Sequence, residues 1–274
     1  MKWSTSFRTP GRNVTPSTHG QFGLFGFFGT LRDRESKISM TIQDRLARLD
    51  WKAIEASLWQ QGYAKTDSLL TAAQCDALVS LYGQDQLFRS RIDMKRFRFG
   101  EGEYKYFTYP LPPLVQTLRE HIYPRLAVIA NAWAKALGQP DNFPLSHDQL
   151  LAVCRRNGQA KPTPLLLRYA AGDYNCLHQD LYGAVAFPLQ LTAFLSRPDR
   201  DFSGGEFLLL EQRPRAQSRG EVLAPKQGEV VIFATRHRPA QGSRGYYRVN
   251  MRHGVSTVRS GSRFTLGVIF HDAK

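Results

Sequence analysis

The sequence of 274 residues predicts an α+β protein with a double-stranded β-helix, or jelly-roll, core and supporting N-terminal helices. A block of segments with helical apolar spacing comes first. From Leu165 onward the chain changes to eight short β-rich runs separated by clusters of Gly, Pro, Asp and Ser. Eight strands after a helical block fit a jelly-roll with helices packed on one sheet. The eight runs are 165–170, 175–181, 188–196, 205–210, 220–224, 229–234, 247–258 and 263–270.

Apolar spacing and end signals define the helical segments. The first has apolar residues every three to four positions and a stop at Gly62, and the second opens with Thr71 as N-cap. The third contains Pro124, so we expect it to be broken or kinked there. The four segments are 41–61, 71–82, 114–137 and 146–154.

Composition divides the chain into three parts. Residues 1–39 are rich in Ser, Thr and Gly and have no acid before Asp33, which predicts a disordered extension. Residues 40–160 are expected to form the helical support region, and residues 161–274 the jelly-roll. Within the support region, residues 96–107 alternate aromatic and basic side chains around Gly-x-Gly, as a β-hairpin or lid would.

The chain is strongly basic. Lys plus Arg number 37 and Asp plus Glu 23, giving a formal net charge of +14. Such a surplus favours a polyanionic partner, above all nucleic acid, although a solvated basic surface without such a partner is the alternative. No acid lies between Glu229 and Asp272, where the arginines are Arg236, Arg238, Arg244, Arg248, Arg252, Arg259 and Arg263.

The three cysteines, Cys75, Cys154 and Cys176, lack C-x-x-C spacing. This argues against a disulfide framework or a structural zinc site and favours a reducing, cytoplasmic location. No apolar run approaches the length needed to cross a membrane. The sequence gives no indication of a protein partner.

His178-Gln179-Asp180 is the first candidate for chemistry. Residues two apart on a strand face the same side, so the imidazole and the carboxylate can be aimed at one point. His253 would complete a 2-His-1-carboxylate set, which holds Fe(II) and leaves positions open for a co-substrate and O₂. Arg263 lies at an even offset from His253 on extended chain and can point into the same cavity as a cation for a carboxylate.

The motifs around these residues resemble those of the Fe(II)/2-oxoglutarate-dependent dioxygenases of the prolyl-hydroxylase and AlkB type. The resemblance covers about residues 164–271 and is closest to a bacterial oxygenase family predicted to demethylate damaged DNA bases. It implies Fe(II) on His178, Asp180 and His253, and 2-oxoglutarate held by Arg263 and Tyr169, with O₂ as the second co-substrate. The matching stretches are Arg168 to Asp180, Ser203 to Phe207 (G-G-E), Gly228 to Phe233, and His253 to Arg263 (H-x-V…V-x-x-G-x-R).

Two assignments have a competitor. His237 also follows the strand at 229–234, but only His253 has the continuation to Arg263. His237, between Arg236 and Arg238, is expected to be a loop residue. Arg259 also lies at an even offset from His253 and is the alternative cation for the co-substrate.

Substrate contacts are predicted on two segments flanking the iron cavity. In the 96–107 hairpin, Tyr104, Tyr106 or Phe107 would stack on a base, and Arg96, Arg98 and Lys105 would contact phosphate. In the acid-free stretch, Arg238 and Arg244 would contact phosphate. The alternative is that both segments only pack on the core.

The function predicted is oxidative demethylation of alkylated bases in nucleic acid, in DNA repair. A protein hydroxylase acting on prolyl or another side chain is the alternative within the enzyme class. A non-catalytic jelly-roll binding module is the alternative outside it, and the complete His-Asp-His set argues against that.

Overall fold

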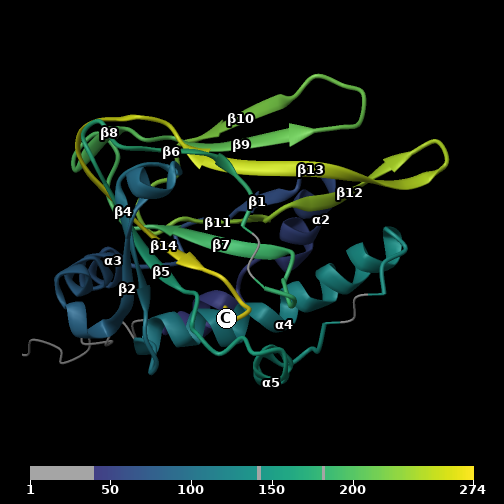
Figure 1. Ribbon diagram of the computed structural model, residues 1–274, viewed down its shortest axis with the longest axis horizontal. Coiled ribbons are helices and arrows are strands. Elements are labelled where there is room, and N and C mark those ends of the chain that lie inside the picture. Colours follow the sequence, from purple (N-terminus) through teal and green to yellow (C-terminus); the bar gives the residue numbers. More distant parts are fainter. Residues whose placement is uncertain (1–39, 141–142, 181–182) are drawn as a thin grey trace, which may run out of the picture. The chain divides into compact units, whose positions relative to one another are not determined.

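Two antiparallel sheets stack to form the centre of the protein (Figure 1). The computed structural model describes residues 40–140, 143–180 and 183–274. We call the eight-stranded sheet the major sheet. Its order is β1 (Tyr63–Lys65), β11 (Val230–Ala234), β7 (Leu189–Phe194), β14 (Val258–Val268), β5 (Leu165–Ala170), β4 (Glu103–Phe107) and β2 (Phe88–Asp93), with β8 (Phe202–Gly204) paired to β14. The predicted α+β jelly-roll class is confirmed.

The six-stranded minor sheet carries the two long hairpins visible in Figure 1. Its order is β10 (Arg219–Leu223), β9 (Phe207–Gln212), β13 (Gly245–Val255), β6 (Tyr174–His178) and β3 (Gly100–Glu101), with β12 (His237–Gly242) paired to β13. All eight strands expected after Leu165 are present, and β8 and β12 are additional. The expectation that His237 lies in a loop is wrong, because β12 pairs with β13 from His237–Asn250 to Gly242–Gly245.

The helices cover the face of the major sheet that lies away from the minor sheet, as α4 and α5 show in Figure 1. Asp50 accepts a hydrogen bond from the Ala53 amide and caps a new helix, so the single helix expected over 41–61 is two. The expected break at Pro124 does not occur, since α4 continues through it. The helices are α1 (Ile42–Ala47), α2 (Trp51–Gln61), α3 (Ala72–Ser80), α4 (Pro113–Ala136) and α5 (His147–Arg156), with the short 3₁₀ helices η1 (Leu81–Gly83), η2 (Asp85–Leu87) and η3 (Met94–Phe97).

Residues 40–160 are not only a helical support, because they also supply β1 to β4. The hairpin expected over 96–107 is instead formed by β2 and β4, whose register runs from Phe88–Phe107 to Asp93–Glu103. The chain between them forms η3 and then β3, which pairs with β6 of the other sheet. Gly100 makes that pairing possible, since a Cβ there would collide with the Tyr174 carbonyl oxygen.

Among the described residues, no helix is long and apolar enough to cross a membrane. The disorder expected for residues 1–39 concerns residues outside those that the structure describes.

Candidate active site

A β-bulge in β6 positions the first histidine. Asn175 pairs with Val255 and His178 with His253, so Cys176 and Leu177 together oppose the single residue Gly254. Strict alternation from Asn175 would turn Leu177 inward, but the extra residue of a bulge shifts the phase by one. Both Asn175 and His178 therefore line the cavity between the sheets. Gly254 permits the bulge, because a Cβ there would lie 2.7 Å from the Asn175 carbonyl oxygen.

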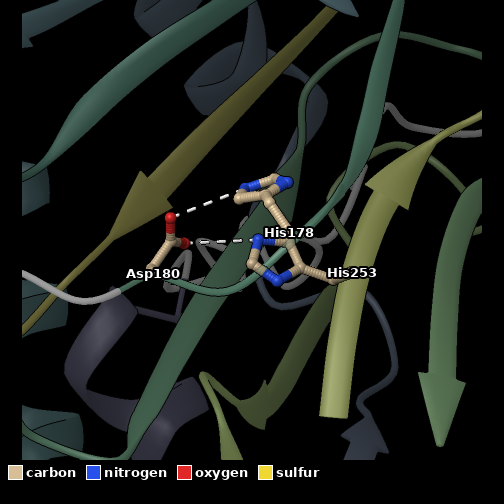
Figure 2. Close-up of side chains that lie close together, drawn as sticks. All are labelled: His178, Asp180 and His253. Carbon is tan, nitrogen blue, oxygen red and sulfur yellow. Dashed lines mark ion pairs between the residues drawn. The ribbon is translucent and has the colours of Figure 1, made fainter. Parts of the chain in front are cut away.

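His178, Asp180 and His253 converge in this cavity (Figure 2). Asp180 lies beyond the end of β6 and not on the strand itself. Its Oδ1 is 3.5 Å from Nε2 of His178, and its Oδ2 is 3.2 Å from Nε2 of His253. One ligand atom from each residue lies within 4.8 Å of the others. The three side chains could hold one metal ion.

Hydrogen bonding favours the tautomer that a metal site needs. Nδ1 of His178 lies 2.7 Å from the Cys176 carbonyl oxygen, and donation of a proton there leaves the Nε2 lone pair for a metal. Burial acts to raise the pKa of Asp180, but the charges and hydrogen bonds of His253 and His178 hold it well below its usual range. Burial and the neighbouring His178 lower the pKa of His253. The site therefore combines an ionised carboxylate with an imidazole that favours its neutral form.

Gln190 on β7 also contacts this cluster, and the sequence analysis missed it. Its Nε2 donates to Oδ2 of Asp180 at 2.7 Å and lies 3.4 Å from Nε2 of His253. One feature of the sequence could have indicated it, because Gln190 is the one amide side chain in the otherwise mostly apolar strand Leu-Gln-Leu-Thr-Ala-Phe. A side chain that orients a carboxylate in this way supports the geometry of a metal site.

Arg263 is a buried cation on the major sheet, facing the same cavity. Arg263 is 2% exposed, and its Nη1 has no hydrogen-bond partner. Burial lowers its pKa to about 10. No described carboxylate forms an ion pair with it. Its aromatic neighbours are Tyr169, Phe194 and Phe202, whose ring centroids lie 5.4–6.0 Å from the guanidinium carbon.

The positions of Arg263 and Tyr169 follow from strand pairing. They are direct partners on β14 and β5, so they share a face of the major sheet. His253 belongs to the minor sheet, so it and Arg263 meet across the cavity and do not lie on one continuous strand. The even spacing was therefore not the reason for their convergence. Arg259, the alternative cation, is exposed and does not line the cavity.

The cavity has a volume of about 280 Å³ and both sheets line it. Tyr169 is fully buried, burial raises its pKa to about 12, and its hydroxyl accepts a hydrogen bond from Asn175 at 3.2 Å. Tyr104 and Phe99 also line the cavity. The remaining wall is mainly apolar and includes Leu165, Leu167, Phe207, Val255 and Ile269.

Two of the aromatic residues predicted to stack on a base are packed elsewhere, which corrects that expectation. Phe107 is fully buried and stacks on Phe88 with a centroid distance of 4.7 Å. Tyr106 is buried beneath the guanidinium of Arg89, 4.5 Å from its ring centroid. The reason is that β4 lies between β2 and β5 in the sheet and is not an exposed hairpin. Of the three aromatic residues, only Tyr104 reaches the cavity.

The predicted phosphate contacts also divide. Arg238 is 2% exposed, and its guanidinium forms an ion pair with Glu211, so its assignment as a phosphate contact is corrected. Arg96, Arg98 and Arg244 are exposed. Lys105 is buried and pairs with Asp85 at 2.6 Å, so its assignment as a phosphate contact is also corrected. His237, the alternative ligand, lines a different cavity with Trp133 and Phe143. There burial and the charges of Arg236 and Arg248 lower its pKa to about 4.

Comparison with known proteins identifies the family. The family model Oxygenase-NA, described as an oxygenase catalysing oxidative methylation of damaged DNA, matches residues 102–273. The chain belongs to this family. As a member of Oxygenase-NA it is an oxidoreductase, and its His-Asp-His cluster is of the type that holds Fe(II) in non-haem oxygenases.

Two curated relatives of this Oxygenase-NA chain are proteins of Mycobacterium tuberculosis named as uncharacterized, from strains CDC 1551 / Oshkosh and H37Rv. Each is 49% identical over 167 residues, covering 61% of this chain and 72% of the relative. Among solved structures, a Pseudomonas putida prolyl-4-hydroxylase aligns with a TM-score of 0.48 and 12% identity, over 82% of this chain and all of that chain. A Burkholderia pseudomallei oxidoreductase of the 2OG-Fe(II) oxygenase family aligns with a TM-score of 0.43 and 17% identity, over 81% of this chain and 92% of that one.

Proposed function

We propose that this oxygenase removes methyl groups oxidatively from alkylated bases in DNA. In this proposal His178, Asp180 and His253 bind the iron, and Arg263 and Tyr169 bind 2-oxoglutarate. The observation that carries the proposal is that a carboxylate, two imidazoles and an unpaired buried guanidinium share one cavity.

The cavity fits iron because its ligand atoms come from three points on one side. His178 and His253 offer Nε2, and Asp180 offers a carboxylate oxygen. A set of this type would hold Fe(II) and leave positions for O₂ and a co-substrate. Gln190 donates to the Asp180 oxygen that also faces His253, which restricts the orientation of the carboxylate. The contact between Cys176 and His178 fixes the first imidazole.

The cavity fits 2-oxoglutarate because the guanidinium of Arg263 has no ion-pair partner among the described carboxylates. Burying a guanidinium without a counter-charge is unfavourable, and a planar carboxylate offers it two parallel hydrogen bonds. The distal carboxylate of 2-oxoglutarate supplies such a group. Tyr169, paired with Arg263 across the strands, offers it a hydroxyl on the same face.

Iron at this site, with 2-oxoglutarate as the electron source, supplies the activation of O₂ that inserts one oxygen atom into a substrate C–H bond. The other oxygen atom enters succinate, and CO₂ is released. On an N-methyl group the product is an N-hydroxymethyl group, which separates into formaldehyde and the unmethylated base. Oxidation therefore removes a methyl group from a damaged base, and the apolar cavity wall keeps water away from the reacting carbon.

Charge supports a nucleic-acid substrate. The net charge is +14, and arginines lie exposed along and beside the β12–β13 hairpin. With Arg238 committed to Glu211, the phosphate contacts in this proposal come from its exposed neighbours. These are Arg236, Arg244, Arg248 and Arg252.

The test is product formation by the full chain with Fe(II), 2-oxoglutarate and O₂. Oligonucleotides with N-methylated bases are compared with unmethylated oligonucleotides and with proline-containing peptides. We expect succinate and formaldehyde in equal amounts from methylated oligonucleotides, retained by His237→Ala and lost in His253→Ala. Succinate release driven by peptides and not by oligonucleotides would instead identify a protein hydroxylase. No succinate under any condition, despite DNA binding, would contradict an oxygenase.

A further inference from the structure

Two phenylalanines stand in solvent at the entrance of the cavity. Phe97 is 54% exposed and Phe99 47% exposed. Their rings stack on each other with a centroid distance of 5.7 Å and an interplanar angle of 19°. Phenylalanine is usually buried, and neighbouring exposed rings that are not needed for packing indicate a binding surface. Phe99 lines the cavity that contains His178 and Asp180, so the pair extends from that cavity outward.

The backbone holds this pair in a defined place. Met94 is fully buried, and its carbonyl oxygen accepts a hydrogen bond from the Phe99 amide at 3.1 Å. The Phe99 carbonyl oxygen in turn accepts one from the Cys176 amide at 2.8 Å. Cys176 precedes His178 on β6 by two residues. The backbone of Phe99 is therefore tied directly to the strand that carries a proposed iron ligand, and Phe97 stacks on the Phe99 ring.

Two free cations alternate with the rings. Arg96 and Arg98 are exposed and form no ion pair with any described residue, whereas Lys95 pairs with Glu101 at 3.2 Å. Arg98 has φ 60 and ψ 29, a left-handed conformation that glycine adopts without cost.

We infer that Phe97, Phe99, Arg96 and Arg98 form a platform that binds single-stranded DNA next to the cavity. The rings stack on bases adjacent to the nucleotide that enters the cavity, and the two guanidiniums contact its backbone phosphates. Each nucleotide has one flat base and one negative charge, and residues 96–99 offer cationic and aromatic side chains in alternation along the chain. In a duplex the faces of the bases are already stacked, so the platform selects an unpaired strand. This inference rests on the proposed function for what enters the cavity.

The test measures binding of a fluorescein-labelled thymidine 12-mer by fluorescence anisotropy at low salt. Phe97→Ala removes one ring from the platform, and Leu145→Ala is the matched control, an apolar side chain of similar exposure immediately before α5. We expect Phe97→Ala to bind the single strand roughly 5- to 150-fold more weakly, the range for loss of one base–aromatic stack. Phe97→Trp should retain binding. Thermal melting and Fe(II) binding verify that each variant is folded.

The two arginines have a separate signature. Replacing Arg96 and Arg98 together by Gln should flatten the dependence of log affinity on log salt by about 1.4 units, roughly 0.7 per lost phosphate contact on a single strand. Phe97→Ala should leave that slope unchanged, since stacking releases no counterions.

Equal affinity of Phe97→Ala and Leu145→Ala for the single strand would overturn the platform, as would an equal loss on single strand and duplex. Tighter binding of the corresponding RNA by the wild type would overturn the assignment to DNA, and binding of no oligonucleotide at all would overturn the whole inference. Formaldehyde release tests the proposed function separately. Phe97-dependent DNA binding without formaldehyde would leave the platform standing and contradict the demethylase.

Discussion

Two buried arginines lie in opposite situations. Arg238 and Arg263 are each 2% exposed. The guanidinium of Arg238 pairs with Glu211, with Nε 3.0 Å from the carboxylate, and it also donates to the Trp59 carbonyl oxygen. Arg263 has aromatic rings around it, an unpartnered Nη1 and no described carboxylate in an ion pair.

This difference distinguishes a buried arginine that belongs to the fold from one that is available to bind a ligand. A buried cation with an internal carboxylate has its charge compensated within the fold and has no capacity left for a ligand. A buried cation without one costs free energy in the unliganded protein and repays it when an anion binds. By this criterion the region around Arg238 holds β9 and β12 together, while the region around Arg263 is a binding site.

The largest expected effect lies in the cavity. His178→Ala, Asp180→Ala or His253→Ala should each reduce Fe(II)-dependent 2-oxoglutarate turnover to background, because each removes one ligand of a three-point set. Succinate formation is the measurement. His237→Ala is the control, since His237 lies in another cavity, and it should keep most of its turnover. If His253→Ala kept its activity and His237→Ala lost it, then His237 and not His253 would be the metal ligand.

Replacing Arg238 should lower the free energy of unfolding more than replacing Arg263. Arg238→Met leaves Glu211 with only Arg213, so we expect a loss of about 3 kcal/mol in the free energy of unfolding, the low end for a broken buried pair. Arg263→Met removes an unpaired buried charge and weak cation–π contacts, so the change should be less than about 1 kcal/mol, or stabilising. Urea unfolding without co-substrate measures both. A large loss in Arg263→Met would mean that its charge has a structural partner.

Replacing Gln190 should have an intermediate effect, which is a partial loss of Fe(II) affinity. Gln190→Leu removes the hydrogen bond to Asp180 and keeps a side chain of similar size. We expect Fe(II) affinity to fall roughly 10- to 100-fold, the range for loss of a group that orients a metal ligand. Fe(II) titration under anaerobic conditions measures it. Unchanged affinity would show that the strands alone orient the carboxylate.

The smallest effect concerns pH and two buried histidines, His147 on α5 and His271 near the C-terminus. Burial, with the charge of Arg119, lowers the pKa of His147 and of His271 to about 4 from 6.5. Between these values the unfolded chain binds more protons than the folded one, so stability should fall as pH falls from 6.5 towards 4. Urea midpoints at pH 7 and pH 5 measure the loss. His147→Phe should reduce it, and an unchanged loss would assign it to other groups.

Much of the cavity could be predicted from the sequence. His178, Asp180 and His253 converge as expected, and Arg263 and Tyr169 face the same space. The resemblance to the dioxygenase motifs carries this information, because the H-x-D, G-G-E and H-x-V…V-x-x-G-x-R stretches occur here in the same order. Their assignment as ligands of iron and 2-oxoglutarate stays a prediction until the variants are measured.

The errors have one physical origin, which is pairing between distant segments. Tyr106 and Phe107 are buried because β4 pairs with β5, across more than fifty residues of chain. Arg238 is not available for phosphate because it forms an ion pair with Glu211 of β9. The bulge that turns His178 inward depends on Gly254 of another strand. No pattern within a single segment specifies such pairings.

The most direct test is binding of 2-oxoglutarate, measured by calorimetry under anaerobic conditions with Fe(II) present, for wild type, Arg263→Met and Arg238→Met. We expect Arg263→Met to weaken binding by about 2–5 kcal/mol, the range for loss of a buried charged partner, while Fe(II) affinity is retained. Arg238→Met, assayed below its melting temperature, should bind 2-oxoglutarate as the wild type does. Wild-type affinity in Arg263→Met would contradict the assignment of the unpaired arginine to the co-substrate.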